Sequence, residues 1–487
     1  MASLQIKLIE EERVERLLIV LVLLLGFSLH LIRIQAPLLG YHSWRQCATA
    51  MVARNFLRNG FHLWYPQVDL AGPNPGTWGA EFQIYPFLVA LLYKLFGIRE
   101  WLGLLLSSGF AIGTGLVFYL LVRSLLGNVV GLLSLGLLNV LPVFVYFTRA
   151  FMPESLMVFA SVLSVFFIWK WSLRRNWLWL ILSGLSLALA ILLKANAGYL
   201  LVPVGCFFWK TYRIKLLLRW QVWMFLLLSL LPPVLWYLHA RNLEFAIDVL
   251  HPGSDPKWGS FTFWFSWQFY HRVFLQWTCE QTLLYPGFFL ALLGLIWSWR
   301  EPRLSLFRAW LAGVTLSFLL VAGGTFVHVY YTLPLVLPGA VFAAYAIAKL
   351  WSLNHRSLRY WARGIVIVSI ILMTRASLVK LLRWTRPNQT TYSTALLAKE
   401  LTPGGSLLIA CDDGQPELLY YADRKGWHLH PEECFPEVLR GYGDKGAQYF
   451  LTTWFGDLAR RPALSGYIST HLRSIRQEDK IYLGEFR

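Results

Sequence analysis

The sequence predicts a polytopic α-helical membrane protein that carries a small extracytoplasmic α/β domain at its C-terminus. Of its 487 residues, 57% are hydrophobic and only 14% are charged, whereas soluble domains average about 25% charged residues. The run ERLLIVLVLLLGFSLHLI at residues 15–32 is long enough to cross a bilayer core of about 30 Å. After residue 385 the long apolar runs stop, and short strand-like and helix-like segments alternate.

About eleven apolar runs qualify as membrane spans by length and composition. The first is too long for a cleaved signal peptide, and no small-residue cleavage site follows it. The predicted spans are 17–34, 101–122, 127–147, 156–173, 177–193, 198–210, 220–240, 281–299, 307–323, 328–349 and 364–381.

The basic residues that give the chain a formal net charge of +18 gather in the short loops on one side of this topology. The acidic residues collect on the other side. This distribution follows the positive-inside rule, so it indicates membrane orientation, with the N-terminus in the cytoplasm, and not nucleic-acid binding.

Two long loops are expected on the outer side, at residues 35–100 and 241–280, and both are rich in aromatic residues. Trp and Tyr favour the membrane interface, so we expect these loops on its surface. Within residues 44–56 the apolar side chains recur at helical spacing, while Arg45 and its polar neighbours fall on another face. This pattern predicts an amphipathic helix at the interface. A second interfacial helix is expected over 83–97.

Residues 1–384, with both loops, form the expected transmembrane domain, and residues 385–487 form the expected C-terminal domain. In the latter SLLIA, PELLYYADRKG, WHLH, EVLRGYGDKG, AQYFLTT and IYLGEF alternate as short strands and helices. The segment has no glycine-rich phosphate loop and no metal-ligand spacing, which favours a lid or docking role over a second enzyme. Cys411 and Cys434 could form a disulfide, and two free thiols are equally expected.

Ionisable and aromatic side chains are predicted near one depth, at the outer ends of the spans. Charged groups at that depth are costly, and by default they mark a functional site. The candidates are Glu81, Arg149, Glu154, Lys194, His328, Tyr330 and Tyr331.

Each candidate taken alone also has a simpler explanation. Lys194 would snorkel to the interface, and Arg149 and Glu154 would form a structural ion pair. His328 would be a packing residue, and the two tyrosines would belong to the aromatic belt. Asp69, in PQVDLAG, would cap a turn. The joint placement of the candidates, and not any one residue, favours a site.

Carboxylates and cations on the outer face, without a nucleotide-binding motif, suit chemistry on a lipid-linked sugar phosphate. Cytosolic sugar nucleotides do not reach that side, whereas a polyprenyl tail lies in the bilayer. Lys194 and Arg149 would stabilise the charge on the departing phosphate. A carboxylate would accept the proton of an incoming hydroxyl and position the hydroxyl oxygen for attack at the anomeric carbon.

The order of these segments resembles the GT-C glycosyltransferases, in particular the branch of protein O-mannosyltransferases and lipid A aminoarabinose transferases. The likeness covers residues 15–350 and includes AMVARNFLRNG, EFQIYPFLVALLYKLFG, MPES, LLKANAGYL and HVYYTLPLVLP. It implies a GT-C fold and transfer of a sugar, commonly with inversion, from a polyprenyl-phosphate donor. By this resemblance Glu154 takes the acidic position of the second outer loop, and Lys194 matches a lysine at the outer end of a helix.

The first loop departs from the family's pattern. Relatives often have an Asp-Glu pair just before the segment that matches AMVAR, where this chain has Arg45 and Gln46. They have Lys-Pro-Pro where this chain has Glu-Phe-Gln at 81–83. One hypothesis is that Arg45 and Glu81 form a charge-reversed carboxylate–lysine contact, with Glu81 as the general base and Asp69 in reserve. The other is that the departure marks altered or lost activity.

In the leading interpretation Glu154 orients the base or binds the acceptor, and Arg54 joins Lys194 and Arg149 at the phosphate. His328 and Tyr331 shape the sugar pocket, and Arg45 and Tyr330 are further substrate-binding candidates.

The partners implied are a polyprenyl-phosphate sugar donor, the lipid bilayer and an acceptor glycan, lipid or protein. No cofactor is predicted, and dependence on a divalent metal is left open because the chain shows no strong acidic ligand cluster. A bacterial inner membrane is the expected location. Two alternatives are a transporter or flippase of lipid-linked sugars, although no internal repeat supports it, and a catalytically inactive partner that retains the fold.

Overall fold

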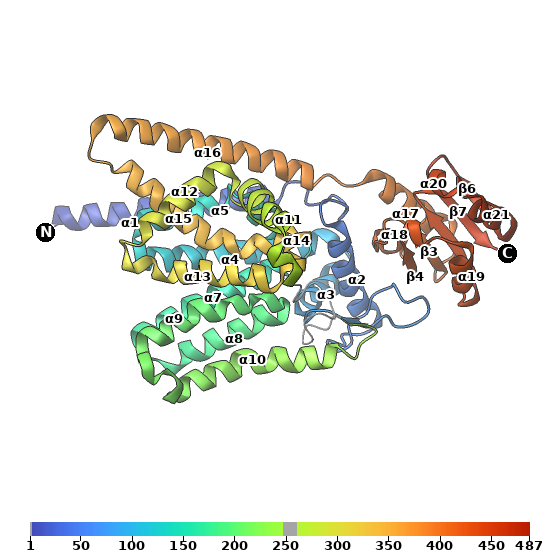
Figure 1. The fold of residues 1–487 in the computed structure, drawn as a ribbon, viewed down its shortest axis with the longest axis horizontal. Helices are drawn as coiled ribbons and strands as arrows, with labels where there is room; N and C mark the ends of the chain where they lie inside the picture. The colour runs from blue at the N-terminus through green and yellow to red at the C-terminus, as the bar shows by residue number, and fades with distance from the viewer. Residues whose placement is uncertain (1, 247–260) are drawn as a thin grey trace. The chain divides into compact units, whose positions relative to one another are not determined.

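A computed structural model describes residues 2–246 and 261–487 of the chain (Figure 1). The predicted outer loop at 241–280 therefore lies partly outside the described residues. The chain forms two compact units. The helical unit comprises the described parts of 1–34, 104–239 and 247–383, and the mixed unit comprises 35–103, 240–246 and 384–487.

The helical unit holds a helix in every predicted span. Its main helices are α1 (Ala2–His30), α4 (Glu100–Leu126), α5 (Asn128–Leu138), α6 (Pro142–Phe147), α7 (Glu154–Arg174), α8 (Trp177–Leu193), α9 (Leu201–Tyr212), α10 (Trp220–Ala240), α12 (Leu284–Ser298), α13 (Ser305–Leu320), α14 (Ala322–Val327), α15 (Leu333–Trp351) and α16 (Arg356–Trp384).

Among the described residues, six helices are long and apolar enough to cross a membrane. A seventh span results if Trp267–Thr282 and Leu284–Ser298, which meet at 106°, cross together. These helices fit an integral membrane protein, and the count of about eleven crossings stays a prediction. The predicted span 127–147 is divided into α5 and α6, because Pro142 has no N–H to continue a helix and fits the first position of a new one.

The mixed unit contains a five-stranded sheet with the strand order β4-β3-β5-β7-β6. Strand β3 pairs parallel with β4 and β5, while β7 pairs antiparallel with β5 and β6. The strands are β3 (Leu407–Cys411), β4 (Lys425–Leu429), β5 (Tyr449–Thr452), β6 (Leu472–Gln477) and β7 (Tyr482–Phe486). The helices between them are α17 (Gln389–Leu401), α18 (Glu417–Ala422), α19 (Pro436–Asp444), α20 (Phe455–Leu458) and α21 (Pro462–His471).

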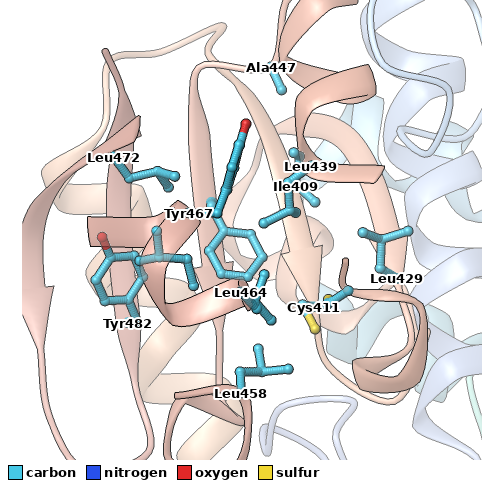
Figure 2. Close-up of a cluster of buried hydrophobic side chains, with 13 residues drawn as sticks. Ile409, Cys411, Leu429, Leu439, Ala447, Leu458, Leu464, Tyr467, Leu472 and Tyr482 are labelled. Carbon is cyan, nitrogen blue, oxygen red and sulfur yellow. The ribbon is translucent and has the colours of Figure 1, made fainter. Parts of the chain in front are cut away.

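One face of this sheet packs on a cluster of buried apolar side chains that includes Ile409, Leu439, Leu464 and Tyr482 (Figure 2). Cys411 and Cys434 belong to the same cluster and are free thiols. A hydrogen bond with Cys434 and burial both raise the pKa of the Cys411 thiol, so it stays protonated and unreactive. Of the two expectations for this pair, the structure contains the free thiols.

The predicted first outer loop folds together with the sheet inside the mixed unit. Its helices are α2 (Ser43–Asn59) and α3 (Ile84–Phe96), which pack on each other, and α2 also packs on α18. The loop covers the outer edge of β4: the Gly426 N–H donates to the Asp69 carbonyl over 3.1 Å, and the Gly72 N–H donates to the Gly426 carbonyl over 2.8 Å. An edge strand that would otherwise stay open is thereby paired.

The predicted interfacial face of α2 is corrected by this packing. Arg45, Gln46 and Thr49, which were expected to form a separate polar face, are as buried as the apolar residues of the helix. The reason is that α3 and α18 both lie against it. Thus α2 is an internal helix of the mixed unit.

Candidate functional site

The first candidate site is an ion pair between Glu154 and Lys194 in the helical unit. Glu154 is the first residue of α7, and Lys194 directly follows α8, so each charge complements the dipole of its helix end. Helices α7 and α8 pack against each other. The Glu154 side chain is fully buried, and that of Lys194 is 12% exposed.

Two tyrosines flank the ammonium group of this pair. The Nζ atom of Lys194 lies 3.9 Å from the ring centroid of Tyr330 and 5.1 Å from that of Tyr331. The ring of His328 stacks on Tyr330 with centroids 5.1 Å apart. The 3₁₀ turn Val329–Thr332 presents both tyrosines. Cation–π contacts of this kind hold a lysine in place without consuming its hydrogen-bond donors.

The pair also leaves polar groups available nearby. Within the described residues, Glu154 Oε2 and Asn196 Oδ1 are buried and have no hydrogen-bond partner. Asn196 belongs to the 3₁₀ turn Ala195–Leu200, which contacts both α7 and α8. Buried acceptors without donors are costly, so a polar ligand or a water molecule that donates to them would lower the free energy of this region.

Arg149 makes contacts that neither prediction for it included, and its role at the phosphate stays a prediction. Its guanidinium donates to the carbonyls of His30 and Ile32 over 2.8 and 2.7 Å, and so it caps the C-terminal end of α1. The expected ion pair of Arg149 with Glu154 is wrong, because Glu154 pairs with Lys194. Snorkelling of Lys194 to the interface stays a prediction.

In the mixed unit Arg45 and Glu81 form the predicted ion pair. Their side chains are 8% and 12% exposed. Arg45 projects from α2, and Glu81 precedes α3, where the Gln83 side chain donates to the Glu81 carbonyl over 2.7 Å. The packing of α2 on α3 therefore brings together two charges that lie 36 positions apart. The contact is confirmed, and the role of Glu81 as a base stays a prediction.

A second buried charge network involves Arg54. Its guanidinium donates to Asp69 and to the Tyr420 carbonyl, each over 2.9 Å, and it lies 2.9 Å from Asp423. Asn55 donates to the other oxygen of Asp69 over 2.9 Å. Asp69 is therefore a buried partner of α2, and the expectation that it caps a turn is wrong.

Electrostatics in this network favour the ionised forms of Arg54 and Asp423. Burial opposes the charge of Arg54, but Tyr420, Asp69 and Asp423 raise its pKa above the usual value. For Asp423 burial also opposes the charge, but Arg58 and Arg54 lower its pKa to about 2. These contacts account for Arg54 and Asp69 as residues that hold α2 on the C-terminal segment, so neither enters the proposed chemistry below.

Sequence reasoning missed two residues of these sites. Asn196 lies in the quoted segment LLKANAGYL, so its closeness to Lys194 was a usable signal. Asp423 gave no signal in the sequence, because its contact with Arg54 spans 369 positions of the chain and only the tertiary fold produces it. In the described part of the chain, no group of three or more His, Cys, Asp or Glu side chains is arranged to hold a metal ion.

Comparisons with known proteins agree with the predicted resemblance. Residues 83–237 match the family described as dolichyl-phosphate-mannose-protein mannosyltransferase. An uncharacterised protein of Aquifex aeolicus is 29% identical over 193 residues, which cover 38% of this chain and 37% of that protein. The match thus spans little more than a third of that relative.

Solved structures show the fold over nearly the whole chain. The ArnT of Cupriavidus metallidurans bound to undecaprenyl phosphate has a TM-score of 0.66 at 14% identity, with 96% of this chain and 97% of that one covered. The oligosaccharyltransferase of Archaeoglobus fulgidus has a TM-score of 0.66 at 11% identity, with 93% and 71% covered. The oligosaccharyltransferase AglB from the same organism, in complex with an inhibitory peptide and a dolichol-phosphate, has a TM-score of 0.61. This chain therefore has the GT-C fold and resembles the dolichyl-phosphate-mannose-protein mannosyltransferases over residues 83–237.

Proposed function

We propose that this chain is a membrane glycosyltransferase that transfers a sugar from a polyprenyl-phosphate-linked donor to an acceptor hydroxyl. The observation that carries the proposal is the buried Glu154–Lys194 pair with its tyrosine wall, in a chain with the GT-C fold. The ArnT and AglB structures that share this fold hold undecaprenyl phosphate and dolichol-phosphate, which supports a lipid-linked donor.

The donor end of the reaction is assigned to the helical unit. Lys194 would bind the phosphate and stabilise the charge that develops on it as the bond to the sugar breaks. Glu154 holds the ammonium in position through the ion pair. Tyr330, Tyr331 and His328 form an aromatic surface beside Lys194 and would contact the sugar.

The acceptor end is assigned to the Arg45–Glu81 pair. The Glu81 carboxylate would accept the proton of the acceptor hydroxyl as the oxygen attacks the anomeric carbon. Attack opposite the departing phosphate inverts that carbon. Arg45 would fix the carboxylate, in the charge-reversed form of the contact that the family resemblance implies.

The proposed setting is a bacterial inner membrane, with the N-terminus in the cytoplasm and the mixed unit on the extracytoplasmic side. The support is the distribution of basic residues between the predicted loops. An acceptor glycan, lipid or protein would reach the site from that side.

A transfer assay with purified protein in proteoliposomes tests the proposal. A panel of radiolabelled polyprenyl-phosphate sugars is supplied with membrane extract as acceptor. We expect the wild type to transfer label, and Glu81→Gln to reduce the rate by about 10²–10⁴-fold, the usual contribution of a general base. Lys194→Gln should lower the rate by about 10²–10³-fold, as the loss of one charge-stabilising group does. Glu478→Gln, on an exposed hairpin residue, should transfer at the wild-type rate.

The pattern across the variants separates the assignments. Full activity of Glu81→Gln with loss in Glu154→Gln would move the base to the helical unit. Binding of the labelled lipid by the wild type without transfer to any acceptor would contradict the enzyme proposal and leave the flippase and the inactive partner.

A further inference from the structure

A cavity of about 260 Å³ lies within the mixed unit, at the start of α2. The first loop contributes His42, Ser43 and Trp44 to its wall, and the segment after β3 contributes Asp412, Asp413 and Glu417. Pockets that bind drug-sized ligands measure about 300–1,000 Å³, so this cavity suits a smaller group, no larger than a single sugar ring.

The wall of the cavity is acidic. It includes three carboxyl groups, and no lysine or arginine is among its described lining residues. Asp412 is held rigidly, since Thr453 donates to its Oδ1 over 2.9 Å and Thr391 to its Oδ2 over 3.3 Å. Asp413 lies in a turn with a φ of +30°.

Glu417 is the most informative group of this wall. Its residue is only 7% exposed, and Ser43 hydrogen-bonds its side chain. The other oxygen, Oε2, is buried and lacks a partner within the described residues. Burial, reinforced by Asp412 and Asp413, raises the pKa of Glu417 to about 7. An acceptor atom of this kind costs free energy unless a ligand donates to it.

The side chains of this wall suit an ammonium group better than a metal ion. The carboxyl groups belong to no cluster of three or more side chains in the described chain that could hold a metal ion. A primary ammonium makes weaker geometric demands, because it donates three separate hydrogen bonds. The Trp44 ring on the wall supplies a face that attracts such a cation.

We propose that this cavity binds a primary ammonium group of the acceptor, and hence that the acceptor is an amine-bearing molecule such as an amino sugar. The identification of the bound molecule as the acceptor rests on the proposed function. The ammonium site itself does not depend on it. The cavity adjoins the partner of the proposed base in the chain: Trp44 precedes Arg45, which pairs with Glu81 and whose guanidinium carbon lies 5.8 Å from the Trp44 ring centroid. An ammonium bound here would anchor an acceptor whose hydroxyl extends toward Glu81.

Saturation-transfer difference NMR on the full chain in detergent tests the site directly. The probes are D-glucosamine, which carries the ammonium, and N-acetyl-D-glucosamine, which has the same ring but no charge. We expect saturation of glucosamine alone. Glu417→Gln and Asp413→Asn should each weaken glucosamine binding about tenfold, which corresponds to about 1.4 kcal/mol. Glu437→Gln, on an exposed residue of α19, is the matched control and should bind as the wild type does.

Equal saturation of the two sugars would overturn the inference, because it would indicate recognition of hydroxyls and not of the charge. So would glucosamine binding that both cavity variants leave unchanged, or no saturation of glucosamine by the wild type. The transfer assay tests the proposed function independently of this binding experiment. Transfer without glucosamine binding removes this inference alone, and glucosamine binding without transfer removes the proposed function alone.

Discussion

At the scale of single residues, the Glu154–Lys194 pair combines two opposed contributions. Burying each charge costs several kcal/mol, and the pair regains that cost only while both partners are present. A buried ion pair is weak evidence for a stabilising role, because an uncharged pair of similar size often gives the same stability. Its presence at adjoining ends of α7 and α8 is therefore better explained by a role in binding.

A double-mutant comparison tests this explanation. Glu154→Gln alone, or Lys194→Gln alone, should destabilise the helical unit by about 3–5 kcal/mol, because an uncompensated charge stays buried. Glu154→Gln/Lys194→Gln together should restore most of the thermal stability, while transfer stays lost. Thermal unfolding in detergent and the transfer assay measure the two effects. Transfer by the double variant at the wild-type rate would show that the pair is structural.

Glu417 predicts a pH dependence of stability. Burial raises its folded-state pKa from 4.5 to about 7, so between these values the folded state binds more protons than the unfolded state, and stability falls as pH rises. At about 1.4 kcal/mol per pH unit, this loss is about 3 kcal/mol and is complete above pH 7. Glu417→Gln should therefore unfold at a higher temperature than wild type at pH 8 and at the same temperature at pH 4.5. Equal melting temperatures at pH 8 would contradict the burial argument.

At the scale of elements, the sequence predicted what local patterns encode. Apolar runs located every long helix, and the alternation in SLLIA, WHLH, AQYFLTT and IYLGEF located β3, β4, β5 and β7. Strand β6 was missed because its sequence, LRSIRQ, is largely polar and exposed, as suits the edge of a sheet. The burial of α2 was missed because it depends on α18, more than 350 positions away in the chain.

The contact between the first loop and β4 depends on a glycine. Gly72 has a φ of +62°, and a Cβ there would lie 2.0 Å from the Trp427 ring. Gly72→Ala should therefore destabilise the mixed unit by about 1–3 kcal/mol, from backbone strain and the displaced indole. Gly404→Ala is the control, since open space surrounds that glycine. Thermal unfolding and protease sensitivity of the first loop measure the effect, and similar stabilities of the two variants would show that the loop adapts at no cost.

At the scale of the whole molecule, the mixed unit is built from three separated stretches of the chain. The predicted boundary after residue 384 coincides with one junction between the units, but the first outer loop joins the C-terminal segment and not the helical unit. The buried network of Arg54 with Asp69 and Asp423 links the two stretches. The loop that carries the proposed base therefore depends on the C-terminal segment for its structure.

Removal of residues 385–487 tests this dependence. The helical unit should still insert into the membrane, whereas α2 should lose α18, one of the two helices that bury it, and transfer should stop. Trypsin provides a local readout, because Arg54 is 7% exposed in the intact unit and should become a cleavage site after truncation. Asp423→Asn should give partial cleavage there, since Arg54 keeps Asp69, and Asp457→Asn, at a side chain 59% exposed, should give none. If Arg54 stays protected and transfer continues in the truncated protein, the first loop folds without the sheet, and the C-terminal segment is a separate docking domain.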